Sequence, residues 1–240
     1  MNVKPFIKPV NYSVIDELKT RFTTVLYSFD KSKSRYEVFK DFIISSACAL
    51  RNSIGAVHIK YFSTELEDEY HSIQEKYSED ERKKFPELYA LLALILDEYR
   101  LPRDVLGELF MVQDFGSDYN GQYFTPHEIT DLLVTVSSIK NHELIAKKGF
   151  VTVNDPTCGA GATTLAKVRK IIEQGYNPLK HMYVECTDLD RLVAMMCYIQ
   201  LSLWMVPARI FVGNSLTLQI RETWITPAYV LGKWQQKLNH

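Results

Sequence analysis

Glycine is scarce in the first half of this 240-residue sequence. Gly55 and Gly107 are the only glycines before residue 115, whereas five lie between Gly116 and Gly161. Glycine is unfavourable inside helices and is favoured where the backbone bends or approaches a ligand closely. The scarcity predicts a helical domain over residues 1–115. The change in glycine content predicts a boundary near residues 115–122 and a second domain over residues 116–240.

The sequence also lacks an excess of positive charge, because its formal net charge is −1. A nucleic-acid-binding domain usually carries a basic excess on at least one surface. Any DNA-binding surface must therefore be a local patch. The candidate residues for contact with DNA phosphates either form such a patch or belong to ordinary solvated helix faces. They are Lys140, Lys147, Lys148, Lys167, Arg169 and Lys170.

Paired cysteines, a signal sequence and long apolar runs are missing as well. The four cysteines have no CxxC spacing, which argues against a zinc site and a disulfide framework. The first ten residues, MNVKPFIKPV, do not resemble a signal peptide. The longest apolar stretch, LYALLALIL, is far shorter than the ~20 residues of a membrane-spanning helix. We therefore expect a cytoplasmic protein with no metal site and no membrane partner.

The first half has apolar residues at helical spacing over residues 35–51 and 105–112. Ser78 and Glu81 form a capping-box pair that predicts the start of a long helix. That helix ends before Pro102, and Pro86 either interrupts or restarts it. The charged segment from Glu65 to Lys84 is interpreted as a solvated helix surface, with a contact arm for a partner as the alternative.

The second half alternates between strands and helices. Residues 150–154 (FVTVN), 182–186 and 210–212 have the apolar and β-branched character of strands. Residues 163–173 and 190–204 lie between them and have helical periodicity. Strands joined by helices are typical of an open α/β sheet with parallel strands.

A glycine-containing loop follows the first predicted strand, in the string VNDPTCGAGATTL. The strand ends at Asp155, Gly159 and Gly161 follow, and a helix then begins. Glycines at such a turn let the backbone pass close to a ligand, with helix N–H groups directed at it. The alternative is an ordinary strand-to-helix turn. Cys158 is either a nucleophile or a small apolar filler, and we favour the filler because no His or Asp partner is evident.

Acidic and amide side chains follow the next two strands. An acidic residue after the second strand of a nucleotide-binding sheet holds ribose hydroxyls. Glu185 and Asp188 compete for that role, and we favour Asp188 because it follows the strand, with Asp190 as a helix cap. Asn214, after the third strand, is a candidate for contact with an adenine ring, although Gly-Asn alone is simply a turn.

The string GQYFTP precedes these elements. Thr125, Pro126 and Glu128 supply an N-cap, an N1 proline and a capping-box glutamate, so a helix is predicted to begin at Pro126. Phe124 lies just before that start. Taken alone, the string predicts only a well-made helix cap.

Taken together, GQYFTP, DPTCGAGATT, TDLD and GNSL resemble the N-6 adenine-specific DNA methyltransferases, especially the modification subunits of type I restriction systems. The resemblance covers about residues 80–216. It implies a helical N-terminal domain and then a truncated Rossmann-like core that uses S-adenosylmethionine, with DNA as partner. The cofactor-binding residues that it implies are Phe124, Thr125, Pro126, Asp155, Cys158, Gly159, Gly161, Asp188 and Asn214.

Three departures from the family pattern concern catalysis. Asn214 stands where the family has aspartate, and no later strands or target-recognition region follow before His240. The Asn-Pro-Pro-aromatic motif, which holds the target amino group and stacks on the flipped base, is absent. The nearest string gives Thr226, Pro227 and Tyr229 as catalytic candidates; the alternative is a turn near the C-terminus.

Three functions therefore stay open. The first is a reduced DNA adenine methyltransferase, completed by a partner chain, by a second copy or by the degenerate string. The second is a non-catalytic binding protein on the same core, such as an anti-restriction decoy, an assembly factor or a regulator. The third is a methyltransferase with another substrate. In each case we expect little or no methyl transfer to DNA by the chain alone.

Overall fold

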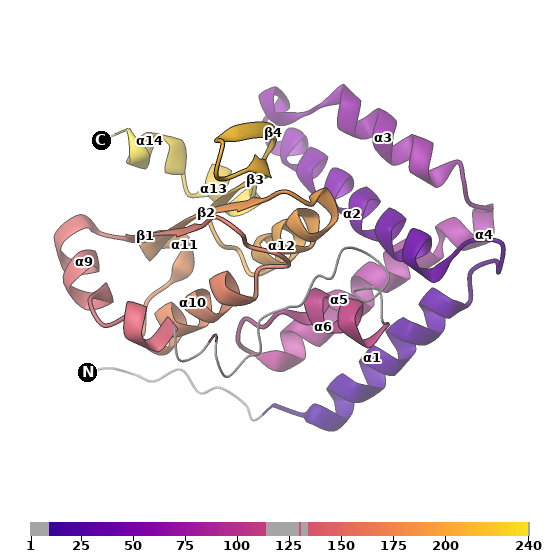
Figure 1. The fold of residues 1–240 in the computed structure, drawn as a ribbon, viewed down its shortest axis with the longest axis horizontal. Helices are drawn as coiled ribbons and strands as arrows, with labels where there is room; N and C mark the ends of the chain where they lie inside the picture. Colours follow the sequence, from indigo (N-terminus) through magenta and orange to yellow (C-terminus); the bar gives the residue numbers. More distant parts are fainter. Residues whose placement is uncertain (1–9, 114–129, 131–133, 240) are drawn as a thin grey trace. The chain divides into compact units, whose positions relative to one another are not determined.

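The computed structural model describes residues 10–113, 130 and 134–239 (Figure 1). The chain divides into two compact units, one whose described residues end at Arg100 and one that begins at Leu101. The boundary that the glycine content predicts, near residues 115–122, falls on residues outside the described part. No helix in the described residues is long and apolar enough to span a membrane.

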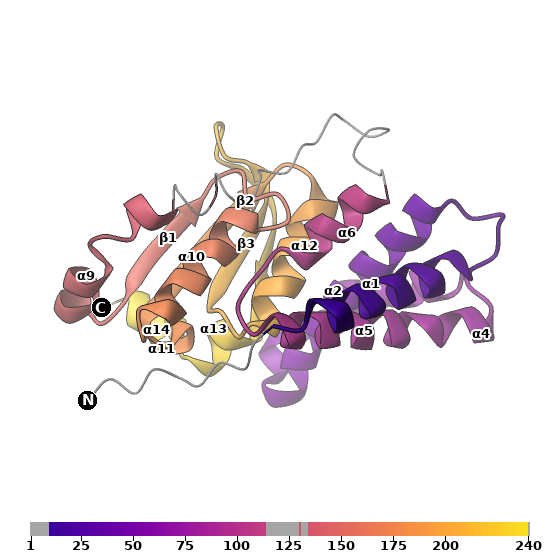
Figure 2. The ribbon, with the colours of Figure 1, turned by 90° about the horizontal axis from the view of Figure 1, so that it is seen from below.

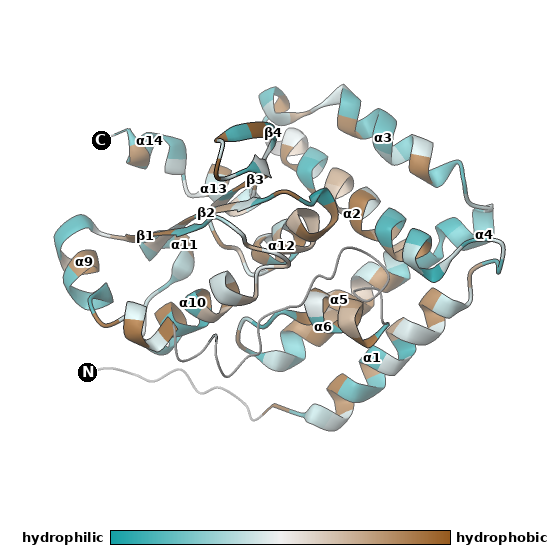
Figure 3. Ribbon diagram, in the orientation of Figure 1, coloured by the Kyte–Doolittle hydropathy of each residue, from teal (hydrophilic) through white to brown (hydrophobic). Residues whose placement is uncertain are grey.

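Every regular element in the described part of the first unit is a helix. The predicted capping box of Ser78 and Glu81 is present. The helix that it starts ends at Arg82, and a new helix begins at Lys84, so the chain restarts just before Pro86. The segment after Ser63 is largely hydrophilic (Figure 3). The elements are α1 (Tyr12–Tyr27), α2 (Arg35–Val57), the 3-10 helix η1 (Ile59–Tyr61), α3 (Thr64–Gln74), α4 (Glu79–Arg82) and α5 (Lys84–Tyr99).

The second unit contains a four-stranded sheet in the order β1-β2-β3-β4. Its first three strands are parallel, which confirms the predicted open α/β fold. Each predicted strand and helix that falls on described residues is present, with ends shifted by a few residues. The helix predicted to begin at Pro126 lies outside the described residues. The elements are α6 (Val105–Val112), α9 (Asn141–Lys148), β1 (Val151–Asp155), α10 (Ala162–Glu173), α11 (Pro178–His181), β2 (Met182–Asp188), α12 (Arg191–Leu203), β3 (Ala208–Asn214), β4 (Gln219–Ile225), α13 (Pro227–Leu231) and α14 (Trp234–Leu238).

Helices α10 and α12 connect the parallel strands and cover one face of the sheet (Figure 2). Both lie on the same face because consecutive right-handed crossovers place their helices on one side. The α12 helix is buried along its whole length, since it packs against β2 and β3 on one side and against α6 on another. This explains why its sequence, RLVAMMCYIQLSL, is apolar around its full circumference.

Strand β4 was not predicted, and it departs from the expected all-parallel sheet. It pairs antiparallel with β3, from Asn214 opposite Gln219 to Arg209 opposite Ile225. Asn214 makes the reversal: its Oδ1 accepts hydrogen bonds from the N–H groups of Leu216 (2.9 Å) and Thr217 (3.2 Å). The Gly-Asn pair is therefore a turn, and the chain returns as a hairpin instead of crossing over.

The hairpin determines the end of the sheet at which the residues after β4 emerge. The carboxyl ends of β1, β2 and β3 lie at one end because these strands are parallel. Since β4 is antiparallel, its carboxyl end lies beside the amino end of β3. Residues that follow β4 therefore emerge at the end opposite to those that follow β1 and β2.

Candidate functional site

The predicted cofactor loop and the predicted ribose-binding acid meet at the carboxyl end of the parallel strands. The N–H of Gly159 donates to Asp188 Oδ2 at 2.8 Å, and the N–H of Cys158 donates to the carbonyl oxygen of Thr187 at 3.0 Å. Two adjacent residues of the loop are thus tied to the last residues of β2. The structure brings together groups that lie about thirty positions apart in the sequence.

Both loop glycines have backbone conformations that favour glycine, with φ of +53° at Gly159 and +101° at Gly161. Gly161 immediately precedes α10 and serves as its N-cap. A Cβ atom at Gly161 would lie 2.9 Å from Cys197 Sγ. Gly161 therefore allows close packing of the loop against α12.

Two carboxyl groups lie at this end of the sheet. Burial raises the pKa of Asp155 and of Asp188. Asp155 Oδ2 accepts a hydrogen bond from the hydroxyl of Thr164 at 3.0 Å. Asp188 Oδ1 accepts from the N–H of Asp190 at 2.9 Å. These partly buried acceptors suit a ligand that donates hydrogen bonds or carries positive charge.

The alternative ribose ligand, Glu185, has different surroundings. It lies within β2, accepts from the Tyr183 hydroxyl at 2.7 Å, and is 3.7 Å from Arg209. Glu185 thus contacts neighbouring side chains within the sheet, whereas Asp188 lies at the end of β2 beside the loop. Asp190 accepts from the N–H of Leu192 at 2.8 Å, which confirms it as the cap of α12.

Asn214 lies at the carboxyl end of β3, so the structure places it at the same end of the sheet as Asp155 and Asp188. Its Oδ1 is occupied by the turn into β4. The amide NH2 group donates to none of the described residues. The amide NH2 group is therefore the part of the Asn214 side chain that can donate a hydrogen bond to a ligand.

Thr226, Pro227 and Tyr229 lie at the opposite end of the sheet, after β4. The Thr226 hydroxyl is buried: it donates to the carbonyl oxygen of Val206 at 2.7 Å and accepts from the N–H of Ala208 at 2.9 Å. Tyr229 packs into a cluster with Tyr183 and Trp234. These three residues support the amino ends of the strands and are not brought together with the loop. Phe124, Thr125 and Pro126 lie outside the described residues.

Sequence reasoning missed Gln200, which is fully buried in α12. Its Oε1 accepts from the N–H groups of Val105 (2.7 Å) and Leu106 (3.1 Å). Its Nε2 donates to Asp104 Oδ1 and to the carbonyl oxygen of Ala160, both at 2.9 Å. Gln200 therefore joins the start of α6 to the cofactor loop. The available signal was a glutamine within an otherwise apolar helix.

The basic candidates for DNA contact differ in their surroundings. Lys140, Lys147 and Lys148 are exposed at the two ends of α9. Lys167 is partly buried, and burial lowers its pKa. On the same helix, α10, Arg169 donates to the carbonyl oxygen of Pro102 at 3.3 Å and Lys170 pairs with Glu173 at 3.6 Å. The lysines of α9 are thus the freer group for binding phosphates.

A parallel sheet with a glycine loop after its first strand, tied to an acid at the end of its second, defines a Rossmann-like core. A family model for N-6 DNA methylases matches residues 102–229. Because this match covers more than half of the chain, the chain belongs to the N-6 DNA methylase family. This confirms the resemblance inferred from the motifs. A search of curated proteins finds no match.

Three solved structures are similar to this chain at low identity. One, a candidate class I S-adenosylmethionine-dependent methyltransferase from Listeria monocytogenes, has 15% identity and a TM-score of 0.45, over 86% of this chain and 55% of that one. A type I restriction-modification methyltransferase subunit from Streptococcus thermophilus has 12% identity and a TM-score of 0.44, over 85% of this chain and 59% of that one. A modification subunit of a candidate type I restriction enzyme from Vibrio vulnificus has 9% identity and a TM-score of 0.44, over 87% of this chain and 57% of that one. The chain thus spans little more than half of their lengths, and likeness this distant carries no argument about activity.

Proposed function

We propose that this chain binds S-adenosylmethionine at the carboxyl end of β1, β2 and β3. We further propose that it serves methylation of adenine N-6 in DNA once a partner chain supplies the groups that hold the target base. The observation that carries the proposal is the hydrogen bond from Gly159 to Asp188, which joins the loop and the acid of the family motifs. Family membership supports the choice of cofactor.

The residues at this end of the sheet fit the cofactor chemically. A carboxylate has about four acceptor positions, and the backbone N–H groups of Gly159 and Asp190 occupy two of those of Asp188. The others can accept from ribose hydroxyls. The amide NH2 of Asn214 can donate to an adenine ring nitrogen. When bound, S-adenosylmethionine supplies an electrophilic methyl group.

Replacing Asp188 with alanine is expected to weaken S-adenosylmethionine binding about 5- to 150-fold. This corresponds to about 1–3 kcal/mol, the usual cost of leaving hydrogen-bonding groups without partners. Isothermal titration calorimetry with purified chain measures the change. Glu185→Gln is the matched control, because it alters the competing acid within the same strand while keeping its size, and its affinity should stay near that of the unmodified chain.

Equal affinity in the unmodified chain and Asp188→Ala, or a larger loss in Glu185→Gln, would place the ribose elsewhere. Absence of binding to the unmodified chain would contradict the cofactor proposal itself. Circular dichroism of each variant separates loss of affinity from loss of fold.

A non-catalytic binding function is the second candidate, and the position of the Thr226–Tyr229 string favours it. Adenine methylation needs two acceptors that hold the amino nitrogen near the cofactor methyl group. The sequence has no Asn-Pro-Pro-aromatic string. The nearest string lies at the other end of the sheet, with its threonine hydroxyl committed to the backbone of Val206 and Ala208.

The purified chain alone is therefore expected to transfer no more labelled methyl group to unmodified bacterial DNA than a blank without protein. The reason is positional, since an error of about 1 Å can already cost about 100-fold in rate. Incorporation of tritium from labelled S-adenosylmethionine measures this. Rapid turnover by the chain alone, lost in Tyr229→Ala while the fold is retained, would show that the string after β4 is catalytic.

A further inference from the structure

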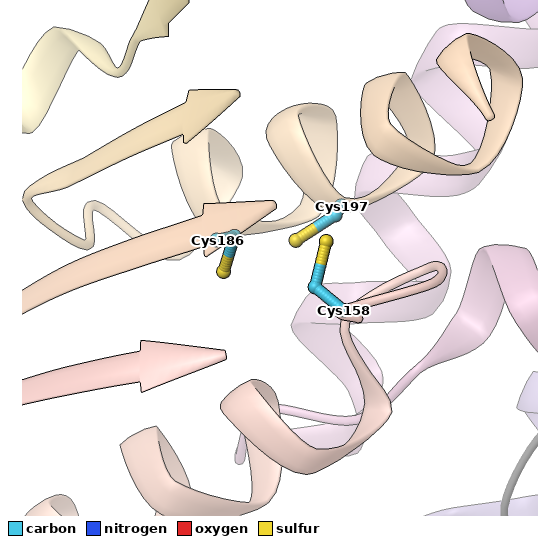
Figure 4. A group of neighbouring side chains, drawn as sticks. All are labelled: Cys158, Cys186 and Cys197. Carbon is cyan, nitrogen blue, oxygen red and sulfur yellow. The ribbon is translucent and has the colours of Figure 1, made fainter. Parts of the chain in front are cut away.

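Three of the four cysteines lie together, although no pair of them has metal-binding spacing in the sequence. Cys158 comes from the loop after β1, Cys186 from β2 and Cys197 from α12. Their sulfur atoms all lie within 4.8 Å of one another, with Cys158 and Cys197 pointing toward each other (Figure 4). All three side chains are buried. Three separate elements therefore present their sulfur atoms to one small region of the core.

The spacing of these atoms is close to that of a metal–thiolate centre. Zinc–sulfur bonds are about 2.3 Å long, so ligands in a trigonal or tetrahedral site lie about 3.8–4.0 Å apart. The observed upper limit of 4.8 Å exceeds this by about 0.8–1.0 Å. Rotation of the Cys158 and Cys197 side chains, or a small shift of the loop, is enough to close the difference.

The electrostatic surroundings favour a cation. Asp155 interacts electrostatically with Cys186, and Asp188 with Cys158. The Thr164 hydroxyl lies 3.5 Å from Cys186 Sγ. Nearby carboxylates oppose binding of an anion and favour binding of a positive ion.

We propose that Cys158, Cys186 and Cys197 form a binding site for one soft, thiophilic metal cation of the Zn²⁺ type. Thiolates are the ligands that such cations prefer, and each thiol that binds releases its proton to solvent. Cys158 is adjacent to Gly159, whose N–H is bonded to Asp188. A bound ion would therefore also immobilise the loop at the candidate cofactor site. The metal site itself stands on the sulfur geometry and does not depend on the proposed function.

Titration of the reduced, metal-free chain with Cd²⁺ and Zn²⁺ tests the site. The thiolate-to-metal absorption of Cd²⁺ is expected to saturate at one ion per chain, with native mass spectrometry confirming the stoichiometry. Cys158→Ser and Cys197→Ser should each weaken binding at least about tenfold, as the loss of a ligand requires. Cys48→Ser is the matched control, because Cys48 is a buried thiol in the helical unit, and it should bind as the unmodified chain does.

Unchanged affinity in Cys158→Ser and Cys197→Ser would overturn the proposal, as would an equal loss in Cys48→Ser or no binding at all. Should a serine variant fail to fold, X-ray absorption of the Zn²⁺-loaded unmodified chain decides. It is expected to show three sulfur neighbours at about 2.3 Å. A coordination shell made only of oxygen and nitrogen would contradict the site.

Discussion

Replacing Gln200 with leucine is expected to lower the free energy of unfolding by about 3–5 kcal/mol. The side chain has no exposed surface and makes four hydrogen bonds, to the N–H groups of Val105 and Leu106, to Asp104 and to the carbonyl of Ala160. Leucine has similar size but leaves those buried groups without this partner. Each costs about 1–3 kcal/mol, and the costs within one network are not additive. Urea denaturation followed by circular dichroism measures the loss.

Ser202→Ala is the matched control on the same helix. The Ser202 hydroxyl is also buried, but it has no hydrogen-bond partner among the described residues. Its removal is expected to change the free energy of unfolding by less than about 0.5 kcal/mol or to increase it slightly. If Gln200→Leu unfolds at the same urea concentration as Ser202→Ala, the bonds between α6, α12 and the loop contribute little to stability.

The parallel core could be predicted because each of its elements carries a local signal. Strand β1 alternates and contains β-branched residues, and β2 is a short apolar run. The helices α10 and α12, which follow these strands, have helical periodicity. The placement of Gly159 and Asp188 at one end of the sheet also followed from sequence, since parallel strands place their carboxyl ends there, whereas the hydrogen bond between them did not. Local pattern and topology were sufficient for these features.

Other features depend on contacts between distant residues and leave no local pattern. Gln200 bonds to Val105, 95 positions away, and nothing near either residue in the sequence indicates the pairing. The three cysteines lack motif spacing because the strand, the loop and the helix assemble them only on folding. Sequence could identify candidate residues of this kind but could not bring them together.

Thr226 illustrates the opposite limit, in which the similarity of a short string suggests a place at the site, whereas the fold puts the string at the other end of the sheet. Its match to the family motif was a threonine, a proline and an aromatic residue after the third predicted strand. Because the Asn214 turn reverses the chain, β4 runs antiparallel and carries the string away from the loop. One turn thus changes which end of the sheet all later residues reach.

Replacing Gly161 with alanine is expected to destabilise the chain by about 2–4 kcal/mol, for two reasons that can be separated. Its φ of +101° is strained for any residue with a Cβ atom, which costs about 1–2 kcal/mol. The added Cβ would also lie 2.9 Å from Cys197 Sγ. Gly175→Ala isolates the first cost, because Gly175 has φ of +86° and nothing within 4 Å of an added Cβ. Urea denaturation in the presence of a chelator measures both variants.

A double-mutant cycle with Cys197→Ala isolates the second cost. Removing Cys197 Sγ takes away the atom nearest to the new Cβ and leaves the next contacts at 3.5 and 3.6 Å, which are ordinary packing distances. The double variant should therefore be more stable than the sum of the single losses predicts, by about 1–2 kcal/mol. Combining Cys197→Ala with Gly175→Ala instead should give additive losses. Additive losses in the Gly161 pair would show that the loop moves away from α12 and that Gly161 is required for its backbone conformation alone.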